Sequence, residues 1–173
     1  VIGISKIVDH PALNAVEDGI QDQLAEMGIE AKFDLQNANG DPNASQTIAA
    51  QFKANKVNLA VGIATPTSQA LVATLQDIPV VFAAVTDPVD AGLVETLEPS
   101  GSNVTGISDL TPVLAQIKFL TTLTEVKKLG HIYTSSEQNA VVLAKMAEEA
   151  CDELGIEFVA VTVEKSADVK QAA

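Results

Sequence analysis

The sequence predicts an α/β fold, in which a doubly wound parallel sheet is covered by helices on both faces. Short runs of β-branched and apolar residues alternate along the chain with stretches that have the period of an amphipathic helix. Several of the apolar runs are continuous, as in strands that are buried on both faces. The expected strands cover residues 1–5, 30–35, 57–63, 80–84, 103–107, 128–133 and 157–163.

Three stretches between these strands carry helix signals. Residues 11–27 place their apolar side chains on one stripe, and Gly28 follows as a stop signal. Asp41 followed by Pro42 has the pattern of an N-cap and a first helical residue. Residues 137–154 repeat the amphipathic pattern before Gly155. Because each helix follows a strand, right-handed crossovers should place helices on both faces of the sheet.

The chain is expected to form two lobes, with the second incomplete. A strand, loop and helix within residues 2–31 recur with similar spacing at residues 130–158. This echo reflects either the general likeness of βαβ units or a second lobe built on the same plan. The Gly/Ser/Thr-rich stretch 101–112 suits a hinge. We therefore predict a first α/β lobe over residues 1–107, and a hinge with a partial second lobe over residues 108–173.

Composition excludes several classes of function. The net charge is −13 and all ten basic residues are lysine, so a basic face for nucleic acid is not expected. Without arginine, a carboxylate would have to be held by helix N-termini, hydroxyls or a lysine. No apolar run is long enough for a membrane span. The start on a strand suggests a mature chain whose signal peptide has been removed.

The sequence also lacks the common catalytic and metal-binding patterns. It contains no G-x-S-x-G elbow, no P-loop and no G-x-G-x-x-G fingerprint. His10, His131 and Cys151 form no group with metal-ligand spacing. We interpret His131 as a structural strand residue and Cys151 as a buried, unreactive thiol. The prediction is a protein that is not an enzyme and that uses no cofactor or metal.

Candidate ligand-binding residues lie in the loops that follow the strands, because open parallel sheets bind ligands at the carboxyl ends of their strands. These loops carry hydroxyls and carboxylates, and several lead directly into helices. Hydroxyls and helix N-termini suit a carboxylate, and an acidic group suits an ammonium, so together they suit a zwitterion. Ordinary N-capping explains the same residue types in any single loop. The candidates are Ser5, Lys6, His10, Thr65, Pro66, Thr67, Ser68, Thr86, Asp87, Ser108, Asp109, Ser135, Ser136 and Glu137.

The same loops resemble those of a known family. The likeness is carried by GISKIVDHPAL (3–13), DLQNANGD (34–41), ATPTSQA (64–70), IPVVFAAVTDP (78–88), NVTGISD (103–109) and YTSSE (133–137). These segments resemble the substrate-binding proteins of ABC transporters, and in particular relatives of the lipoproteins that bind tryptophan and other aromatic amino acids. The resemblance implies the type I periplasmic-binding-protein fold. It also implies that groups after the third and fourth strands hold the ligand, which here adds Ala84 and Val85 to Thr65–Ser68 and Thr86.

The resemblance further implies a function and partners. We expect an extracytoplasmic solute-binding component of an ABC importer, which binds an amino acid, with Trp or Phe favoured, in the cleft between two lobes. Its partners would be that small molecule and an ABC permease, and the receptor itself would be a monomer. It would lie in the periplasm or be anchored outside the membrane by lipid. The alternatives are a ligand-sensing effector domain of a transcriptional regulator and a small α/β enzyme. Family members are longer than this chain.

Overall fold

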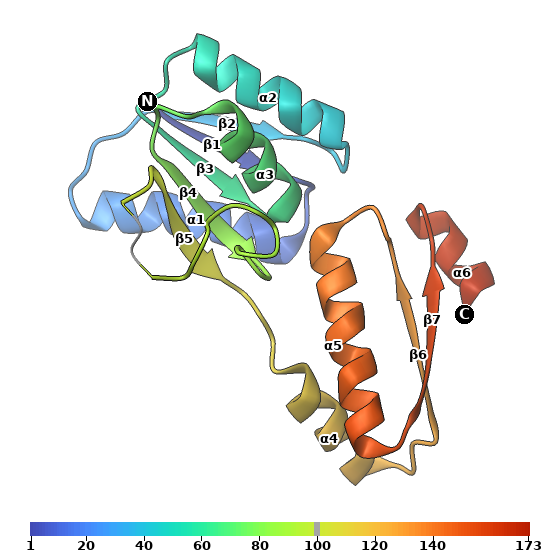
Figure 1. Cartoon of the computed structure of the whole chain (residues 1–173). Helices are drawn as coiled ribbons and strands as arrows, with labels where there is room; N and C mark the ends of the chain where they lie inside the picture. Colours follow the sequence, from blue (N-terminus) through green and yellow to red (C-terminus); the bar gives the residue numbers. More distant parts are fainter. Residues whose placement is uncertain (99–100) are drawn as a thin grey trace. The chain divides into compact units, whose positions relative to one another are not determined.

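The chain divides into two compact units in a computed structural model that describes residues 1–98 and 101–173. We call Val1–Asp109 unit 1 and Leu110–Ala173 unit 2. Unit 1 contains β1 (Ile2–Lys6), α1 (Pro11–Glu26), β2 (Phe33–Asn37), α2 (Pro42–Ala54), β3 (Leu59–Ile63), α3 (Thr65–Thr74), β4 (Val80–Val85) and β5 (Val104–Ser108) (Figure 1). Unit 2 contains α4 (Val113–Leu123), β6 (Lys128–Tyr133), α5 (Gln138–Leu154), β7 (Glu157–Thr162), the 3-10 turn η1 (Ser166–Asp168) and α6 (Val169–Ala172).

Unit 1 is built on a parallel sheet with the strand order β2-β1-β3-β4-β5. Helices α2 and α3 cover one face and α1 covers the other, which confirms the predicted doubly wound sheet (Figure 1). The strand order reverses between β1 and β3, where Ser5 lies opposite Gly62. This reversal is the topological switch point, at which open α/β sheets most often bind ligands.

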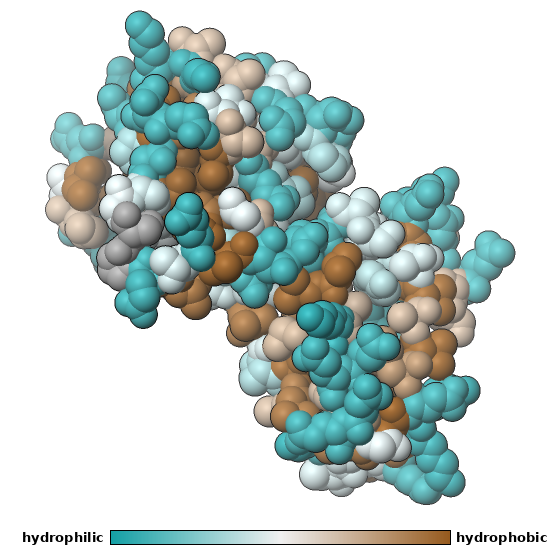
Figure 2. All heavy atoms as spheres, viewed as in Figure 1, coloured by the Kyte–Doolittle hydropathy of each residue, from teal (hydrophilic) through white to brown (hydrophobic). Residues whose placement is uncertain are grey.

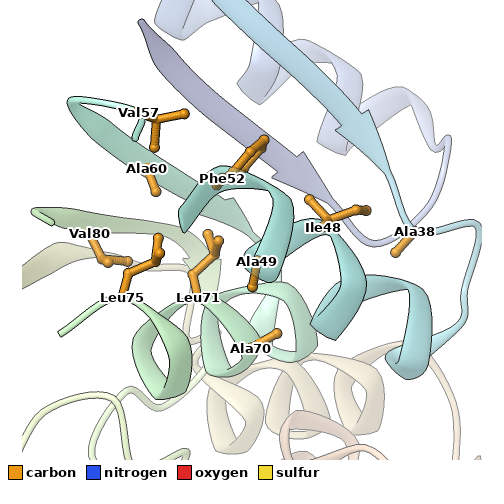
Figure 3. Close-up of a cluster of buried hydrophobic side chains, with 10 residues drawn as sticks. All are labelled: Ala38, Ile48, Ala49, Phe52, Val57, Ala60, Ala70, Leu71, Leu75 and Val80. Carbon is orange, nitrogen blue, oxygen red and sulfur yellow. The ribbon is translucent and has the colours of Figure 1, made fainter. Parts of the chain in front are cut away.

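Apolar side chains on both faces of the sheet hold unit 1 together. On one face, Phe52 of α2 lies directly over Gly3, where a Cβ atom would come within 2.8 Å of the ring. The buried cluster around it fills the space between α2, α3 and the sheet (Figure 3). On the opposite face, Ile4, Val61 and Ile63 pack against the apolar stripe of α1. The cluster in Figure 3 consists of Ala38, Ile48, Ala49, Phe52, Val57, Ala60, Ala70, Leu71, Leu75 and Val80.

Local helix signals in the sequence match the observed helix ends. The Asp41 carboxylate accepts a hydrogen bond from the Asn43 N–H at 2.8 Å, so Asp41 is the N-cap of α2, with Pro42 as the first helical residue. Gly155 ends α5 with a φ of 67°, in the left-handed region that glycine adopts without strain. All seven expected strands are present, with ends shifted by a few residues.

Three of the described helices were not predicted. Helix α3 occupies the segment expected to be a loop after the third strand, α4 follows the stretch 101–112 that was expected to be a hinge, and the short α6 lies at Val169–Ala172. Within α3 only Ala73 is exposed, so the helix is covered on nearly every side. A helix that is buried all round has no polar stripe, and its sequence therefore lacks the amphipathic period that marks surface helices.

Unit 2 has a small core between a two-stranded parallel sheet and two helices. Strand β6 pairs with β7, and α4 and α5 contribute Val113, Ile117, Ala147 and Cys151 to the buried cluster. Cys151 is fully buried, and burial, together with the charge of Asp152, raises the pKa of its thiol. A protonated, inaccessible thiol is unreactive, as the sequence predicts. Hydrophilic and apolar side chains are interspersed on the face of unit 2 visible in Figure 2.

Candidate ligand-binding site

The carboxyl ends of β1, β3, β4 and β5 bring most of the predicted site residues to one edge of unit 1. Because these strands are parallel neighbours, the segments that follow them meet at that edge. The residues placed there are Ser5, Lys6, His10, Thr65, Pro66, Thr67, Ser68, Ala84, Thr86, Asp87, Ser108 and Asp109. Ser135, Ser136 and Glu137 belong to unit 2, where they lie between β6 and α5.

Ser5 brings an unpartnered polar group to the switch point. Its side chain is 1% exposed, and its Oγ has no hydrogen-bond partner among the described residues. Leaving such a group buried and unpaired costs about 1–3 kcal/mol. Ser5 stands next to β3 in the sheet, opposite Gly62. The hydroxyl is therefore an unused donor and acceptor beside the end of β3.

Lys6 lies in a polar cluster within unit 1. Its Nζ donates to Asn14 Oδ1 at 2.8 Å, and it forms ion pairs with Glu17 at 3.2 Å and Asp9 at 3.1 Å. Burial alone would lower the pKa of Lys6, but hydrogen bonds and charge from Asp9 and Glu17 outweigh that effect and raise it. The three donors of the ammonium are matched by these three acceptors, so a direct contact with ligand would require one of them to be given up.

His10 serves as the N-cap of α1. Its Nδ1 accepts a hydrogen bond from the Ala12 N–H at 3.2 Å, and Pro11 follows as the first helical residue. The side chain is exposed. Capping accounts for this residue within unit 1, and a role in ligand binding stays a prediction.

Thr67 and Ser68 turn their hydroxyls toward the backbone of the preceding strand. Thr67 Oγ1 lies 2.7 Å from the Ile63 carbonyl oxygen, and Ser68 Oγ lies 2.8 Å from that of Ala64. Both side chains are fully buried. A hydroxyl has a single proton to donate. In this geometry their protons go to backbone carbonyls, and the expectation that these two hydroxyls hold a ligand carboxylate stays a prediction.

The N-terminus of α3 is the strongest anion-binding feature at this edge. Its cap residue, Ala64, makes no side-chain capping bond. Thr65 is the first helical residue, and Pro66, the second, has no N–H. The first turn of a helix has N–H groups without intrahelical partners and carries partial positive charge. Thr65 and Thr67 thus supply backbone donors that suit a carboxylate.

The segments after β4 and β5 are tied together by polar contacts. Thr86 Oγ1 lies 3.4 Å from Asp109 Oδ1, and Ser108 Oγ donates to the Thr86 carbonyl at 2.8 Å. The Asp109 N–H also donates to the Val85 carbonyl at 3.1 Å. Thr86 is buried and Asp109 is exposed, so this pair presents a carboxylate held in place by the strand ends.

Among the remaining candidates, Asp87 has a local structural role. One carboxylate oxygen of Asp87 accepts from the N–H groups of Val89 and Asp90, both at 3.0 Å, and this stabilises the turn after β4. Ala84 has a φ of 53°, an uncommon value for a residue other than glycine. Glu137 occupies the N-cap position of α5 without making a capping bond, and Ser135 and Ser136 are exposed.

Four residues that take part in this arrangement were not among the predicted candidates. Asp9, Asn14 and Glu17 complete the cluster around Lys6, and Ala64 adopts a φ of 82° at the end of β3. The positions of Asn14 and Glu17 in the first two turns of α1 are a signal that could have been used, since that helix starts beside the end of β1. No sequence signal marks Ala64, because alanine normally avoids positive φ.

A surface hollow beside β5 is distinct from this edge. Of the predicted candidates its lining includes only Ser108, and the rest of the lining comes from Phe82 of β4, from β5 and from described residues between these two strands. Among the described residues no group of His, Cys, Asp or Glu side chains could hold a metal ion. Within the same residues, no helix has the length and apolar character needed to cross a membrane.

Comparison with known proteins supports a relation over the full length of the chain. A tyrosine-binding protein from Clostridioides difficile (strain R20291) is 38% identical over 99% of this chain and 51% of its own length. A solved structure of a conserved domain protein from Vibrio cholerae is 44% identical, with a TM-score of 0.96, and covers 99% of this chain and 60% of that one. The chain thus spans about half the length of the curated relative and 60% of that structure.

A third relative has a ligand bound. The ABC domain from Streptococcus pneumonia in complex with L-Trp is 37% identical, with a TM-score of 0.94, over 99% of this chain and 59% of that one. A leucine binding protein from Thermotoga maritima is 19% identical, with a TM-score of 0.73, and shares the type I periplasmic-binding fold. Residues 1–173 all match the family described as ABC transporter substrate binding protein, so this chain belongs to that family.

Proposed function

We propose that this chain is the ligand-binding portion of a receptor that captures an aromatic L-amino acid for an ABC importer. The single observation that carries the proposal is the pairing of opposite charge at one edge of unit 1. The uncapped N-terminus of α3 provides positive potential after β3, and Asp109 provides a carboxylate after β5. A zwitterion with both end groups on one carbon matches such a pair without any arginine.

The two end groups are assigned as follows. The ligand carboxylate accepts hydrogen bonds from backbone N–H groups at Thr65 and Thr67, in the first turn of α3. The ammonium donates to the Asp109 carboxylate and to the neighbouring Thr86 hydroxyl oxygen, which lie 3.4 Å apart. Ser5, Ala84 and Ser108 line the same edge, and Ser135, Ser136 and Glu137 stay predicted ligand-binding residues.

The aromatic preference is inferred from the relatives. One relative at 38% identity is a tyrosine-binding protein, and another at 37% identity was solved with L-Trp. Membership of a substrate-binding family supports transport over the effector-domain alternative and over enzymatic activity. The partners are then the amino acid and a membrane permease. The receptor acts as a monomer outside the cytoplasmic membrane, in the periplasm or anchored by lipid.

Titration calorimetry of the full-length, ligand-stripped protein is expected to show one-to-one binding of L-Trp, L-Tyr or L-Phe. Leucine, ribose and adenine serve as comparison ligands of other shapes and classes. Tighter binding of an aromatic amino acid than of leucine supports the assignment. Binding of ribose or adenine, with no amino acid bound at millimolar concentration, would contradict it.

Replacing Asp109 with asparagine is expected to weaken affinity for the amino acid by about tenfold or more. The change removes the negative charge that faces the ammonium, and hydrogen bonds to charged groups contribute about 1.5–3 kcal/mol. Asp77→Asn is the matched control, since Asp77 is an exposed carboxylate elsewhere in unit 1. If both variants bind the ligand as the wild type does, the ammonium does not lie at Asp109.

A further inference from the structure

The backbone at the end of β3 adopts a conformation that alanine rarely takes. Ala64 has φ 82° and ψ 161°, in a region populated almost only by glycine. Its N–H donates to the Ala83 carbonyl of β4 at 2.9 Å, which anchors the turn to the neighbouring strand. Residues persist in such conformations only where surrounding contacts hold them there.

The contacts that hold Ala64 come from Thr67 and Ser68. Thr67 Oγ1 lies 2.7 Å from the Ile63 carbonyl and 3.1 Å from that of Ala64. Ser68 Oγ lies 3.0 Å from the Gly62 carbonyl and 2.8 Å from that of Ala64. Two fully buried hydroxyls therefore lie within hydrogen-bonding distance of three successive carbonyls on the strained side of the turn, and each donates its one proton there.

These hydroxyls stabilise the start of α3 without capping it. A serine, threonine or aspartate at the position of Ala64 would accept a hydrogen bond from the first-turn N–H groups. Here the cap residue is alanine and makes no such bond, while the hydroxyls sit at the third and fourth helical positions and face the strand. The first-turn N–H groups therefore receive no side-chain acceptor from the cap residue and can donate to another group, such as a ligand oxygen.

A second polar group at this point also lacks a protein partner. Ser5 Oγ is buried next to Gly62 in the sheet, with no hydrogen-bond partner among residues 1–98 and 101–173. A buried unpaired hydroxyl marks a place where a water molecule or a ligand atom completes the hydrogen bonding.

We propose that Thr67 and Ser68 are positioning residues, which clamp the strained Ala64 turn so that the first-turn N–H groups of α3 stay uncapped and aimed for the ligand carboxylate. The inference rests on the proposed amino-acid site and adds that affinity depends on backbone strain retained in the unliganded protein. Rigidity in the binding-competent conformation raises affinity, because less order has to be gained on binding.

Ala64→Gly in the full-length protein should relieve the backbone strain, and its effects on thermal stability and on ligand affinity are expected to have opposite signs. Glycine adopts this conformation without steric cost, so Tm should rise by about 2–4 °C. The loosened turn should at the same time bind L-Trp or L-Tyr about fivefold more weakly. Ala73→Gly is the matched control, since Ala73 is the exposed alanine of α3. It should lower Tm and leave affinity unchanged.

Thr67→Val and Thr67→Ser test the clamp itself. Thr67→Ser keeps the hydroxyl, so its affinity for L-Trp or L-Tyr should lie within about twofold of the wild type's. Thr67→Val lacks the hydroxyl, and its affinity should be lower by about fivefold or more at a temperature where the variant is folded. If Thr67→Val fails to fold, Thr67→Ser and Ala64→Gly carry the test.

Equal affinity of wild type, Ala64→Gly and Thr67→Val would overturn the inference and show a purely structural role. If the wild type itself binds no amino acid, the proposed function fails first and the inference fails with it, although a higher Tm for Ala64→Gly would still reveal the strain.

Discussion

Replacing Lys6 with methionine is expected to lower the free energy of unfolding by about 3 kcal/mol. The change leaves the Glu17 carboxylate without its cation, and the side chains of both residues are only 11% exposed. Breaking a buried ion pair by removing one partner costs about 3–5 kcal/mol, and we take the lower end because Glu17 lies close to the surface. Urea unfolding of the full-length protein at pH 7 measures the difference. Lys32→Met, at an exposed lysine, is the control and should change stability by less than about 0.5 kcal/mol.

A double variant distinguishes the two roles open to Lys6. Lys6→Met combined with Glu17→Met removes both charges, and apolar residues of similar size can replace a buried pair at little cost. The double variant should therefore recover most of the lost stability. If it also recovers affinity for the amino acid, Lys6 acts within unit 1 only. If stability returns and affinity does not, Lys6 touches the ligand, as the sequence predicts.

The raised pKa of Lys6 gives this pair a definite pH dependence. Desolvation lowers the pKa, and the contacts with Asp9 and Glu17 raise it by more, so the folded value lies above the ordinary 10.5. The folded state then holds its proton more tightly than the unfolded state does. The contribution to stability is complete below about pH 10 and is lost as pH rises through the folded pKa. Lys6→Met should lose less stability than the wild type between pH 10 and 12.

The predictable part of the fold came from features that act within a few residues. Asp41 and Pro42 specify a helix start on their own, and Gly155 specifies a helix end, because capping and left-handed backbone are local matters. The strands were visible as apolar runs for the same reason. Helix α3 escaped prediction because neighbours cover it on nearly every side, and only the tertiary structure supplies them.

The candidate site also has a part that the sequence predicts and a part that depends on the tertiary structure. The rule that ligands bind at the carboxyl ends of strands placed Thr65, Thr86 and Asp109 at one edge, and the sheet order of unit 1 shows that their strands are neighbours. The sequence does not predict where the hydroxyls of Thr67 and Ser68 point, because residue type alone allows them to face either solvent or the strand. The partners of Lys6 depend on how α1 folds back along the sheet.

Gly62→Ala should have the second large effect, a loss of about 2–3 kcal/mol in the free energy of unfolding. A Cβ atom at Gly62 would lie 2.6 Å from Ser68 Oγ, 2.7 Å from Ser68 Cα and 2.9 Å from Ser68 N. Two of these three atoms belong to the backbone of α3, which cannot rotate away as a side chain can. The helix would have to move off β3, and overpacking of this kind costs about 1–3 kcal/mol.

The same displacement should weaken ligand binding, because it shifts the first turn of α3 together with Thr65. Ser68→Gly in the Gly62→Ala background removes the Oγ contact and leaves both backbone contacts, so it should restore little stability. Gly19→Ala is the matched control, since a Cβ atom there meets nothing within 4 Å, and this exposed helical site should gain about 0.5–1 kcal/mol. Urea unfolding and calorimetry with L-Trp measure the two effects. A Gly62→Ala protein with the stability and affinity of the wild type would mean that α3 does not pack directly on β3, and the geometry of the anion site would then have to be abandoned.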